Sequence, residues 1–306
     1  MKAMKKIVVV IVLIVFSINI QAQTNSFKTG ALLWKISGKD LVKPSYVLGT
    51  FHVKPAGYLD QIPGARASFE LAEQVIGEVV TSDMMEQAVK MQQKMMMPSD
   101  TTYKMLYNEA DYQVVDKGLI SILGGVGLEQ LKMLKPSGIQ MSILQILIMK
   151  YYPNINPMEL LDLHIQKMAV EKQKPVVGLE TIDHQIYVLF ESSSLQHQAD
   201  VLLCNIKSNE VKDEEGLIKE LKELEAMYDK ADLNEIYKIY KKNPCSDSEG
   251  DYQINKARND AWMKKLPGLM KDKSSFIAVG ALHLVGEEGL LNQLEKAGYK
   301  VEAVKN

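Results

Sequence analysis

The chain has 306 residues, of which 46% are hydrophobic and 24% are charged, and its formal net charge is −2. This composition is typical of a globular protein with enough residues for one large domain or two small ones. A slightly acidic balance excludes a binder of polyanions, so nucleic acid is not expected as a partner.

The N-terminal stretch "MKAMKKIVVVIVLIVFSINIQAQ" has three lysines, an apolar run from Ile7 to Phe16, and small and polar residues around Ala22. This pattern predicts a signal peptide over residues 1–22 with cleavage after Ala22, and hence a secreted or periplasmic protein. The apolar run is short for a membrane span, which needs about 20 residues, so no stable span is expected after cleavage. The remaining chain has 33 basic and 38 acidic residues, a net charge near −5.

Cys204 and Cys245 are the only cysteines. In an oxidising compartment they could form a disulfide, or each could remain a single thiol, and the sequence leaves both open. Because there is no C-x-x-C pair, a structural zinc site is not expected.

In chain order, the predicted elements begin strand, strand, helix, strand, at residues 32–37, 45–51, 63–74 and 75–80. The middle is helical and includes 84–98 and 158–174. Between these two, the apolar stretch from Pro136 to about Pro153 is interrupted by Ser, Gly and Gln, which predicts a buried core helix rather than a membrane span.

A fourth strand is predicted at 175–181, followed by three charged helical stretches as far as Lys242. A polar break, a helical segment and a final strand–helix–strand unit follow, at 242–250, 251–273, 276–280, 286–298 and 299–304. We therefore expect one α/β domain over 23–306: a central mixed, largely parallel sheet with flanking helices and a large helical insertion, in which about 84–174 and 182–273 are mostly helical.

Four of the predicted strands, "YVLGTFH", "VIGEVV", "PVVGLE" and "AVGALH", have a glycine near the end and a His or Glu within three residues of it: His52, Glu78, Glu180 and His283. Ligands of largely parallel sheets bind outside the carboxyl ends of the strands, and glycine allows the chain to turn there. The two Gly-x-x-His patterns, roughly 230 residues apart, therefore predict two imidazoles at one edge of the sheet.

His52, His283 and Glu78 form a set that could hold a divalent metal such as Mn, Co or Zn. A catalytic metal with three protein ligands and an open position would activate a bound water. Glu180 is then a candidate general base or fourth ligand. Arg258, on a helix before the last Gly-x-x-His strand, is a candidate for stabilising negative charge or orienting a carboxylate.

A structural interpretation stands beside this one. A single His after a strand is usually a hydrogen-bonded turn residue, and the same His, Glu and Arg side chains could form a buried polar network. Glu78 lies inside an apolar predicted strand, where an unpaired carboxylate is costly to bury, and this favours a functional role.

Several segments resemble one known family in its order and over nearly the whole mature chain: "VLGTFHV" (47–53), "VIGEVV" (75–80), "LLDLHIQKMAVEKQKPVVGLETIDHQ" (160–185), "INKARNDAWM" (254–263) and "FIAVGALHLVGEEGLLNQLEKAGYKV" (276–301). The chain resembles the TraB/GumN family, which is related to the TIKI proteins and more distantly to ChaN-like and erythromycin esterase-like proteins.

TIKI proteins are metal-dependent proteases with paired Gly-x-x-His motifs. The resemblance therefore implies a metal-dependent, peptidase-like hydrolase with His52, Glu78 and His283 at its centre, and a peptide or protein substrate. ChaN-like relatives bind haem, so the resemblance also implies an alternative, a non-catalytic protein that binds haem or another ligand in the same crevice.

Overall fold

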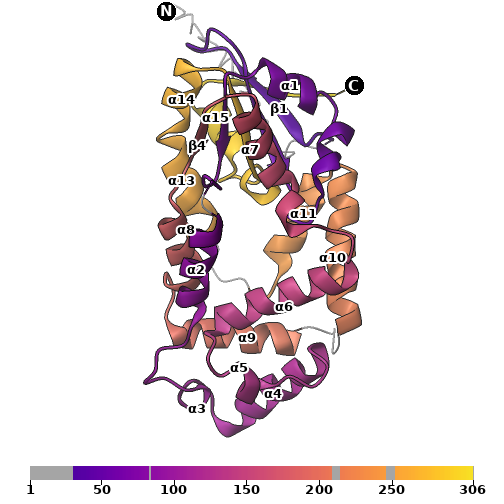
Figure 1. Ribbon diagram of the computed structural model, residues 1–306, viewed down its shortest axis with the longest axis vertical. Helices are drawn as coiled ribbons and strands as arrows, with labels where there is room; N and C mark the ends of the chain where they lie inside the picture. The colour runs from indigo at the N-terminus through magenta and orange to yellow at the C-terminus, as the bar shows by residue number, and fades with distance from the viewer. Residues whose placement is uncertain (1–29, 83, 209–213, 246–251, 306) are drawn as a thin grey trace, which may run out of the picture.

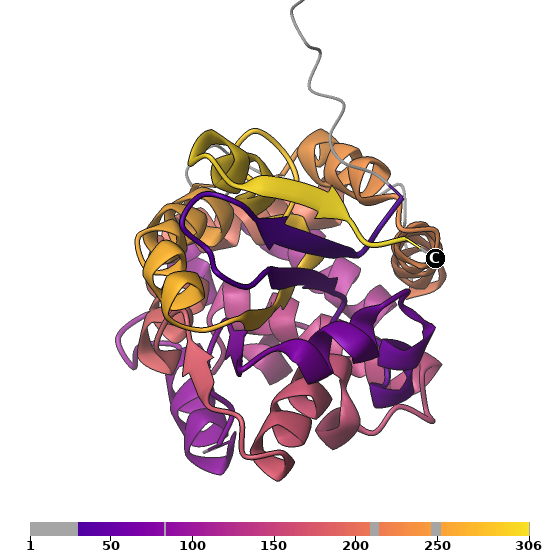
Figure 2. The same ribbon diagram turned by 90° about the horizontal axis from the view of Figure 1, so that it is seen from above.

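The computed structural model describes residues 30–82, 84–208, 214–245 and 252–305, so the predicted signal peptide lies outside the described residues. Six strands form one sheet in the order β4–β3–β5–β2–β1–β6. Their bounds are β1 (Leu33–Ser37), β2 (Ser45–Thr50), β3 (Gln74–Gly77), β4 (Val176–Gly178), β5 (Ser275–Gly280) and β6 (Lys300–Ala303). Figure 2 shows β6, β1 and β2 side by side.

The sheet is mixed and largely parallel, because β1 is antiparallel to its two neighbours and the other adjacent pairs are parallel. Helices flank it, and the α/β fold expected from the sequence is confirmed. Central strand β5, "SFIAVG", is buried almost throughout, as is typical of a parallel strand covered on both faces.

The helices between β3 and β4 are α2 (Met84–Met95), α3 (Tyr103–Leu106), α4 (Glu109–Ile122), α5 (Leu128–Leu131), α6 (Pro136–Tyr151) and α7 (Leu161–Glu171). Those between β4 and β5 are α8 (Ile182–Phe190), α9 (Leu195–Ser208), α10 (Glu214–Asp229), α11 (Leu233–Lys242), α13 (Ala257–Met263) and α14 (Leu266–Asp272). Helices α1 (Ala65–Leu71) and α15 (Leu290–Lys296) and the short turns η1 (Ala56–Gln61), η2 (Pro157–Glu159), η3 (Tyr252–Lys256, a π-helix) and η4 (Ala281–His283) complete the described elements.

The described part of the chain contains two hydrophobic clusters. The larger surrounds the sheet and contains the fully buried Phe69, Trp262 and Phe276. The smaller lies among α4, α6 and α9 and contains Leu119 and Ile139. In Figure 1 the sheet and its helices occupy the upper half and the second group the lower half, with α2 and α8 on one side and α10 and α11 on the other.

Three sequence-based expectations are corrected. Strand β3 ends at Gly77, so Glu78 lies just beyond the strand and not inside it. Four helices, and not three, occupy the stretch from Ile182 to Lys242. Segment 63–74 is helical only over α1, because Ala72 already has extended backbone angles.

Helix α6 was expected to be a buried core helix, yet only four of its residues are buried: Pro136, Gly138, Ile139 and Leu147. Leu144, Ile146 and Met149 on the same helix are exposed. Part of its apolar surface borders a hollow in the molecule instead of a packed core. No helix in the described part of the chain is long and apolar enough to cross a membrane.

Candidate active site

The two Gly-x-x-His segments are neighbours in the sheet. Strands β2 and β5 run parallel, with Thr50 paired to Gly280. His52 follows two residues after β2, and His283 ends the short η4 turn after β5. The carboxyl ends of β2, β3, β4 and β5 therefore place the predicted residues at one edge, because these four strands are adjacent and parallel.

A cavity of about 430 Å³ opens at this edge. Four of the five residues singled out from the sequence line it: His52, Glu78, Arg258 and His283. Apolar side chains from the end of β2 and from α10, α11 and η4 line much of the rest: Phe51, Leu224, Ile236, Ile239 and Leu282. Glu180 is not among the lining residues and reaches the site through Arg258.

Arg258 lies between the two carboxylates. Its Nη2 donates to Glu180 Oε1 at 2.6 Å and to Glu78 Oε2 at 2.5 Å, and its Nε lies 3.1 Å and 3.2 Å from the two Glu180 oxygens. The side chains of Glu78, Glu180 and Arg258 are 13%, 4% and 8% exposed. A buried guanidinium therefore neutralises part of the charge of two buried carboxylates and fixes their orientation.

His283 is fixed at both ring nitrogens. Arg258 Nη1 donates to its Nε2 at 3.0 Å, and its Nδ1 lies 2.8 Å from Oδ1 of Asn259. A guanidinium can only donate, so Nε2 accepts and Nδ1 has the proton. Burial lowers the pKa of His283 to about 4, so the ring is neutral at neutral pH.

Glu78, unlike the neutral His283, is charged at neutral pH. Its burial acts to raise the pKa of the carboxyl. This is more than offset by His283, which gains its proton only in the acidic range where Glu78 titrates, and by the cations Arg258 and His52, so the pKa is lowered to about 2. The Gly280 amide also donates to its Oε1 at 2.8 Å. Glu78 is therefore ionised at neutral pH, with Oε1 at the cavity.

His52 lies at the mouth of the cavity, with 71% of its side chain exposed. Its Nδ1 is 3.2 Å from Oδ2 of Asp162, in the first turn of α7, and the other oxygen of Asp162 accepts a hydrogen bond from Thr50. The Asp162 carboxylate is the main cause that raises the pKa of His52 to about 9. This pair has the geometry of an imidazole that a carboxylate orients, with Nε2 left for chemistry.

Gly280 keeps open the space between His52 and Glu78. A Cβ atom at this position would lie 3.3 Å from Glu78 Oε1 and 3.7 Å from His52 Nε2. Because glycine has no side chain, a water or substrate group can approach both atoms at once.

The expected metal ligands do not fit a metal in this arrangement. His283 Nε2 accepts a hydrogen bond from a cationic guanidinium, and its Nδ1 is engaged by Asn259. For His283 or Glu180 to become a third ligand besides His52 and Glu78, Arg258 would have to move away from it. Among the described residues, no group of three or more His, Cys, Asp or Glu side chains is arranged to hold a metal ion.

Two residues that were not predicted from the sequence, Asp162 and Asn259, orient His52 and His283. Asp162 gave no signal, because an acidic residue in the first turn of an amphipathic helix is common. Asn259 follows Arg258 directly in a segment that carries the family resemblance, but neighbouring helix positions face different directions, so no role at the site was predicted for it.

The model of the TraB/PrgY/gumN family matches residues 32–303. The chain belongs to the TraB/PrgY/gumN family. No curated protein and no solved structure matches the chain. The matched range covers all six strands. Each residue of the site described above therefore lies within the part of the chain that matches the TraB/PrgY/gumN family.

Proposed function

We propose that this protein is a hydrolase of amide bonds that works outside the cytoplasm, with His52 as its general base. The observation that supports this most is the His52–Asp162 pair at the mouth of a cavity, facing the ionised Glu78 across Gly280. A general base needs a defined tautomer and a working nitrogen within reach of a water, and the hydrogen bond to Asp162 supplies the first.

In this mechanism a water lies over Gly280, between His52 Nε2 and Glu78 Oε1. The neutral form of His52 takes a proton from the water as it attacks the carbonyl carbon. Asp162 and Glu78 are both anionic and stabilise the imidazolium that forms, which then protonates the leaving amine. His283 and Glu180 are positioning residues, because they hold Arg258, which in turn holds Glu78.

In this proposal, Asn255 contacts the amide group of the substrate. Its side chain lines the cavity, and its Oδ1 is buried without a hydrogen-bond partner among the described residues. A buried acceptor is stabilised by a donor, and a substrate N–H is a donor of the right kind. Asn255 belongs to the π-helix η3, a rare conformation that is frequent at functional sites.

Two observations support a location outside the cytoplasm. The N-terminal stretch has the pattern of a cleavable signal peptide. Cys204 and Cys245, which the sequence left open, form a disulfide with Cα atoms 5.5 Å apart. Disulfides persist in oxidising compartments.

The test uses the mature chain from Gln23 with fluorogenic peptides and acyl amides, assayed across pH with and without a chelator. We expect hydrolysis that survives the chelator and rises as pH approaches about 9, because the neutral form of His52 is the base. Hydrolysis that needs added Mn, Co or Zn would support the metal-dependent alternative. A Soret absorbance without any hydrolysis would support the haem-binding alternative.

A further inference from the structure

Two further chambers adjoin the active-site cavity. One of about 560 Å³ lies among α6, α9, α10 and α11, and one of about 450 Å³ lies among α6, α8 and α9. Both the larger chamber and the active-site cavity are lined by Glu220, Leu224 and Ile239. Tyr240 and Ile254 line both the smaller chamber and the cavity, and Asn243 lines all three. The three spaces are therefore neighbours that share walls, and we call the two outer chambers together the hollow.

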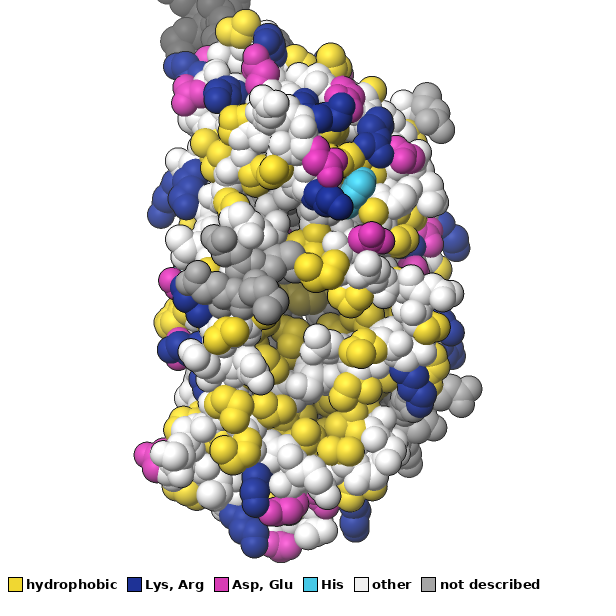
Figure 3. All heavy atoms as spheres, viewed as in Figure 1, with side chains coloured by type: hydrophobic (Ala, Val, Ile, Leu, Met, Phe, Trp, Pro, Cys, Tyr) yellow, Lys and Arg dark blue, Asp and Glu magenta, His cyan; other side chains and the backbone are white. Residues whose placement is uncertain are grey.

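The hollow is largely apolar. Figure 3 shows hydrophobic side chains gathered around a depression across the middle of the molecule. Of the described residues that line the larger chamber, only Glu220 and Lys242 are charged. Leu144 of α6 lines both chambers and is 44% exposed, which explains why so apolar a helix is poorly buried. An apolar surface of this extent next to a reaction site indicates a ligand with a large apolar part.

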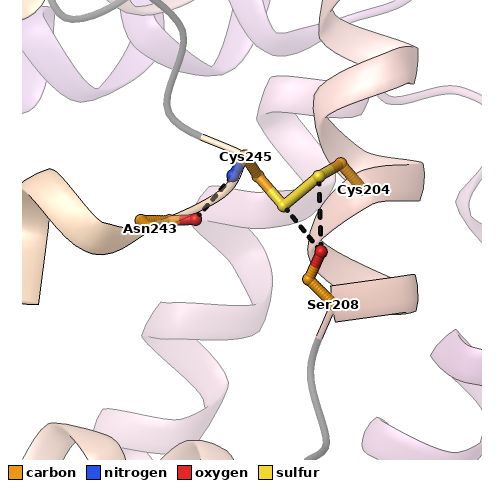
Figure 4. The surroundings of a disulfide bond; sticks show 4 residues. All are labelled: Cys204, Ser208, Asn243 and Cys245. Atoms are coloured by element: carbon orange, nitrogen blue, oxygen red, sulfur yellow. Dashed lines mark hydrogen bonds between the residues drawn. A yellow bond between two sulfur atoms is a disulfide. The ribbon is translucent and has the colours of Figure 1, made fainter.

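A disulfide bond joins two walls of the hollow. Cys245 lines both chambers, and its disulfide with Cys204 ties the residues after α11 to α9 (Figure 4). The amide of Cys245 also donates to Asn243 Oδ1 at 2.9 Å. Two walls joined in this way form a preorganised space, which lowers the entropy that a ligand must lose on binding.

A hydrocarbon chain fits this surface better than a peptide does. A peptide would bring an N–H and a C=O with every residue, and each needs a partner when it leaves water. Aliphatic side chains supply no such partners, and they form most of the larger chamber, as Ile143, Leu147, Leu202, Ile206, Leu217 and Leu221 illustrate. An acyl chain needs only apolar contacts.

We infer that the hollow binds the long acyl chain of the substrate, so that the scissile bond is the amide of an N-acyl compound. This inference rests on the proposed function for the position of the carbonyl, which lies in the active-site cavity beside His52. The acyl chain then passes between Leu224 and Ile239 into the larger chamber. Each methylene that leaves water strengthens binding by about fourfold.

A binding measurement tests the hollow without hydrolysis. The probe is dodecylpyrene, a neutral hydrocarbon, with dodecanamide as competitor, and its fluorescence is followed with wild type, Leu144→Arg and Met149→Arg. Leu144→Arg places a charge in the hollow, whereas Met149 is exposed on the same helix and does not line either chamber. We expect wild type and Met149→Arg to bind equally and Leu144→Arg at least tenfold more weakly.

Hydrolysis of acetyl, octanoyl and dodecanoyl anilides then separates the two proposals. We expect kcat/KM to rise with chain length, and Leu144→Arg to reduce the dodecanoyl-to-acetyl ratio at least tenfold. Hydrolysis without chain-length preference, or probe binding that Leu144→Arg leaves unchanged, would overturn the acyl-chain inference and leave the hydrolase proposal standing. Probe binding that needs Leu144, with no hydrolysis of any anilide, would overturn the hydrolase proposal alone. Displacement of the probe by an apolar peptide but not by dodecanamide would show that the ligand is a peptide.

Discussion

Nη1 of Arg258 lies 3.0 Å from Nε2 of His283 and donates a hydrogen bond to it. This contact separates the roles of the two Gly-x-x-His motifs. His283 is buried and held by Arg258 and Asn259, whereas His52 is exposed at the cavity mouth and held only on its Nδ1 side. In the proposed function, the motif with His283 forms part of the wall of the site and the motif with His52 provides the reactive imidazole.

Replacing Arg258 with Met should destabilise the fold strongly. The change leaves the carboxylates of Glu78 and Glu180 buried without their shared cation, and breaking a buried ion pair costs about 3–5 kcal/mol. Urea unfolding of the two proteins at neutral pH measures the loss. The matched control is Arg66→Met, because Arg66 pairs with Asp60 at the surface and should cost below about 1 kcal/mol. Equal losses in the two variants would contradict the buried triad.

Much of the sheet was predictable from the sequence because strands β2, β3, β4 and β5 are short, mainly apolar runs that contain or end in glycine. Parallel pairing follows when helical segments separate such runs, as between β3, β4 and β5. The position of α6 was not predictable, since an apolar helix that borders a hollow has the same composition as one in a packed core.

The convergence of His52, Glu78, Glu180, Arg258 and His283 was predictable, because four of them follow strand ends that meet at one sheet edge. Their individual states were not. Whether His283 accepts from Arg258 or faces a ligand depends on a helix that is distant in sequence from the strand. The same holds for Asp162, whose pairing with His52 depends on how α7 packs beside β2.

His283 should make the fold sensitive to acid. Its pKa is about 4 in the folded chain and near its ordinary value of 6.5 when unfolded, so the unfolded chain binds a proton that the folded chain does not. Stability is therefore lost as pH falls from 6.5 towards 4, by up to roughly 3 kcal/mol. Urea unfolding across this range should show a shallower pH dependence for His283→Gln. A wild-type slope in His283→Gln would contradict the assignment.

His52 should titrate well above its ordinary range. The Asp162 carboxylate raises the pKa of His52 to about 9, so Asp162→Asn should return it towards 6.5. The pairing contributes stability fully below pH 6.5 and loses it as pH rises through 9, because the folded pKa is the higher one. NMR titration of the imidazole signals measures both values. Asp183→Asn changes an exposed carboxylate on α8 and serves as the control. A His52 pKa that is ordinary in wild type, or that is unchanged in Asp162→Asn, would contradict the pairing of His52 with Asp162.

The disulfide should stabilise the helical part of the chain. Cys204 and Cys245 close a loop with a sequence separation of 41, for which chain entropy gives about 2–4 kcal/mol. The double variant Cys204→Ser and Cys245→Ser should therefore melt at a lower temperature, and reductant should lower the melting temperature of wild type but not of the variant. Identical melting of all samples, or free thiols in protein taken from the oxidising compartment, would show that the bridge is absent.

In the proposed function, His52 performs the chemistry and His283 supports the structure. The most direct test compares His52→Gln and His283→Gln in kcat/KM for a dodecanoyl anilide and in the free energy of unfolding at neutral pH. We predict that His52→Gln loses at least about a hundredfold in kcat/KM, the lower range for a general base, and loses only the stability of its exposed pair with Asp162, below about 1 kcal/mol. His283→Gln should lose about 1–3 kcal/mol of stability, because Arg258 and Asn259 lose a well-placed partner. Equal losses of kcat/KM in the two variants, with stability unchanged in both, would contradict the account and indicate that the two imidazoles act as a pair.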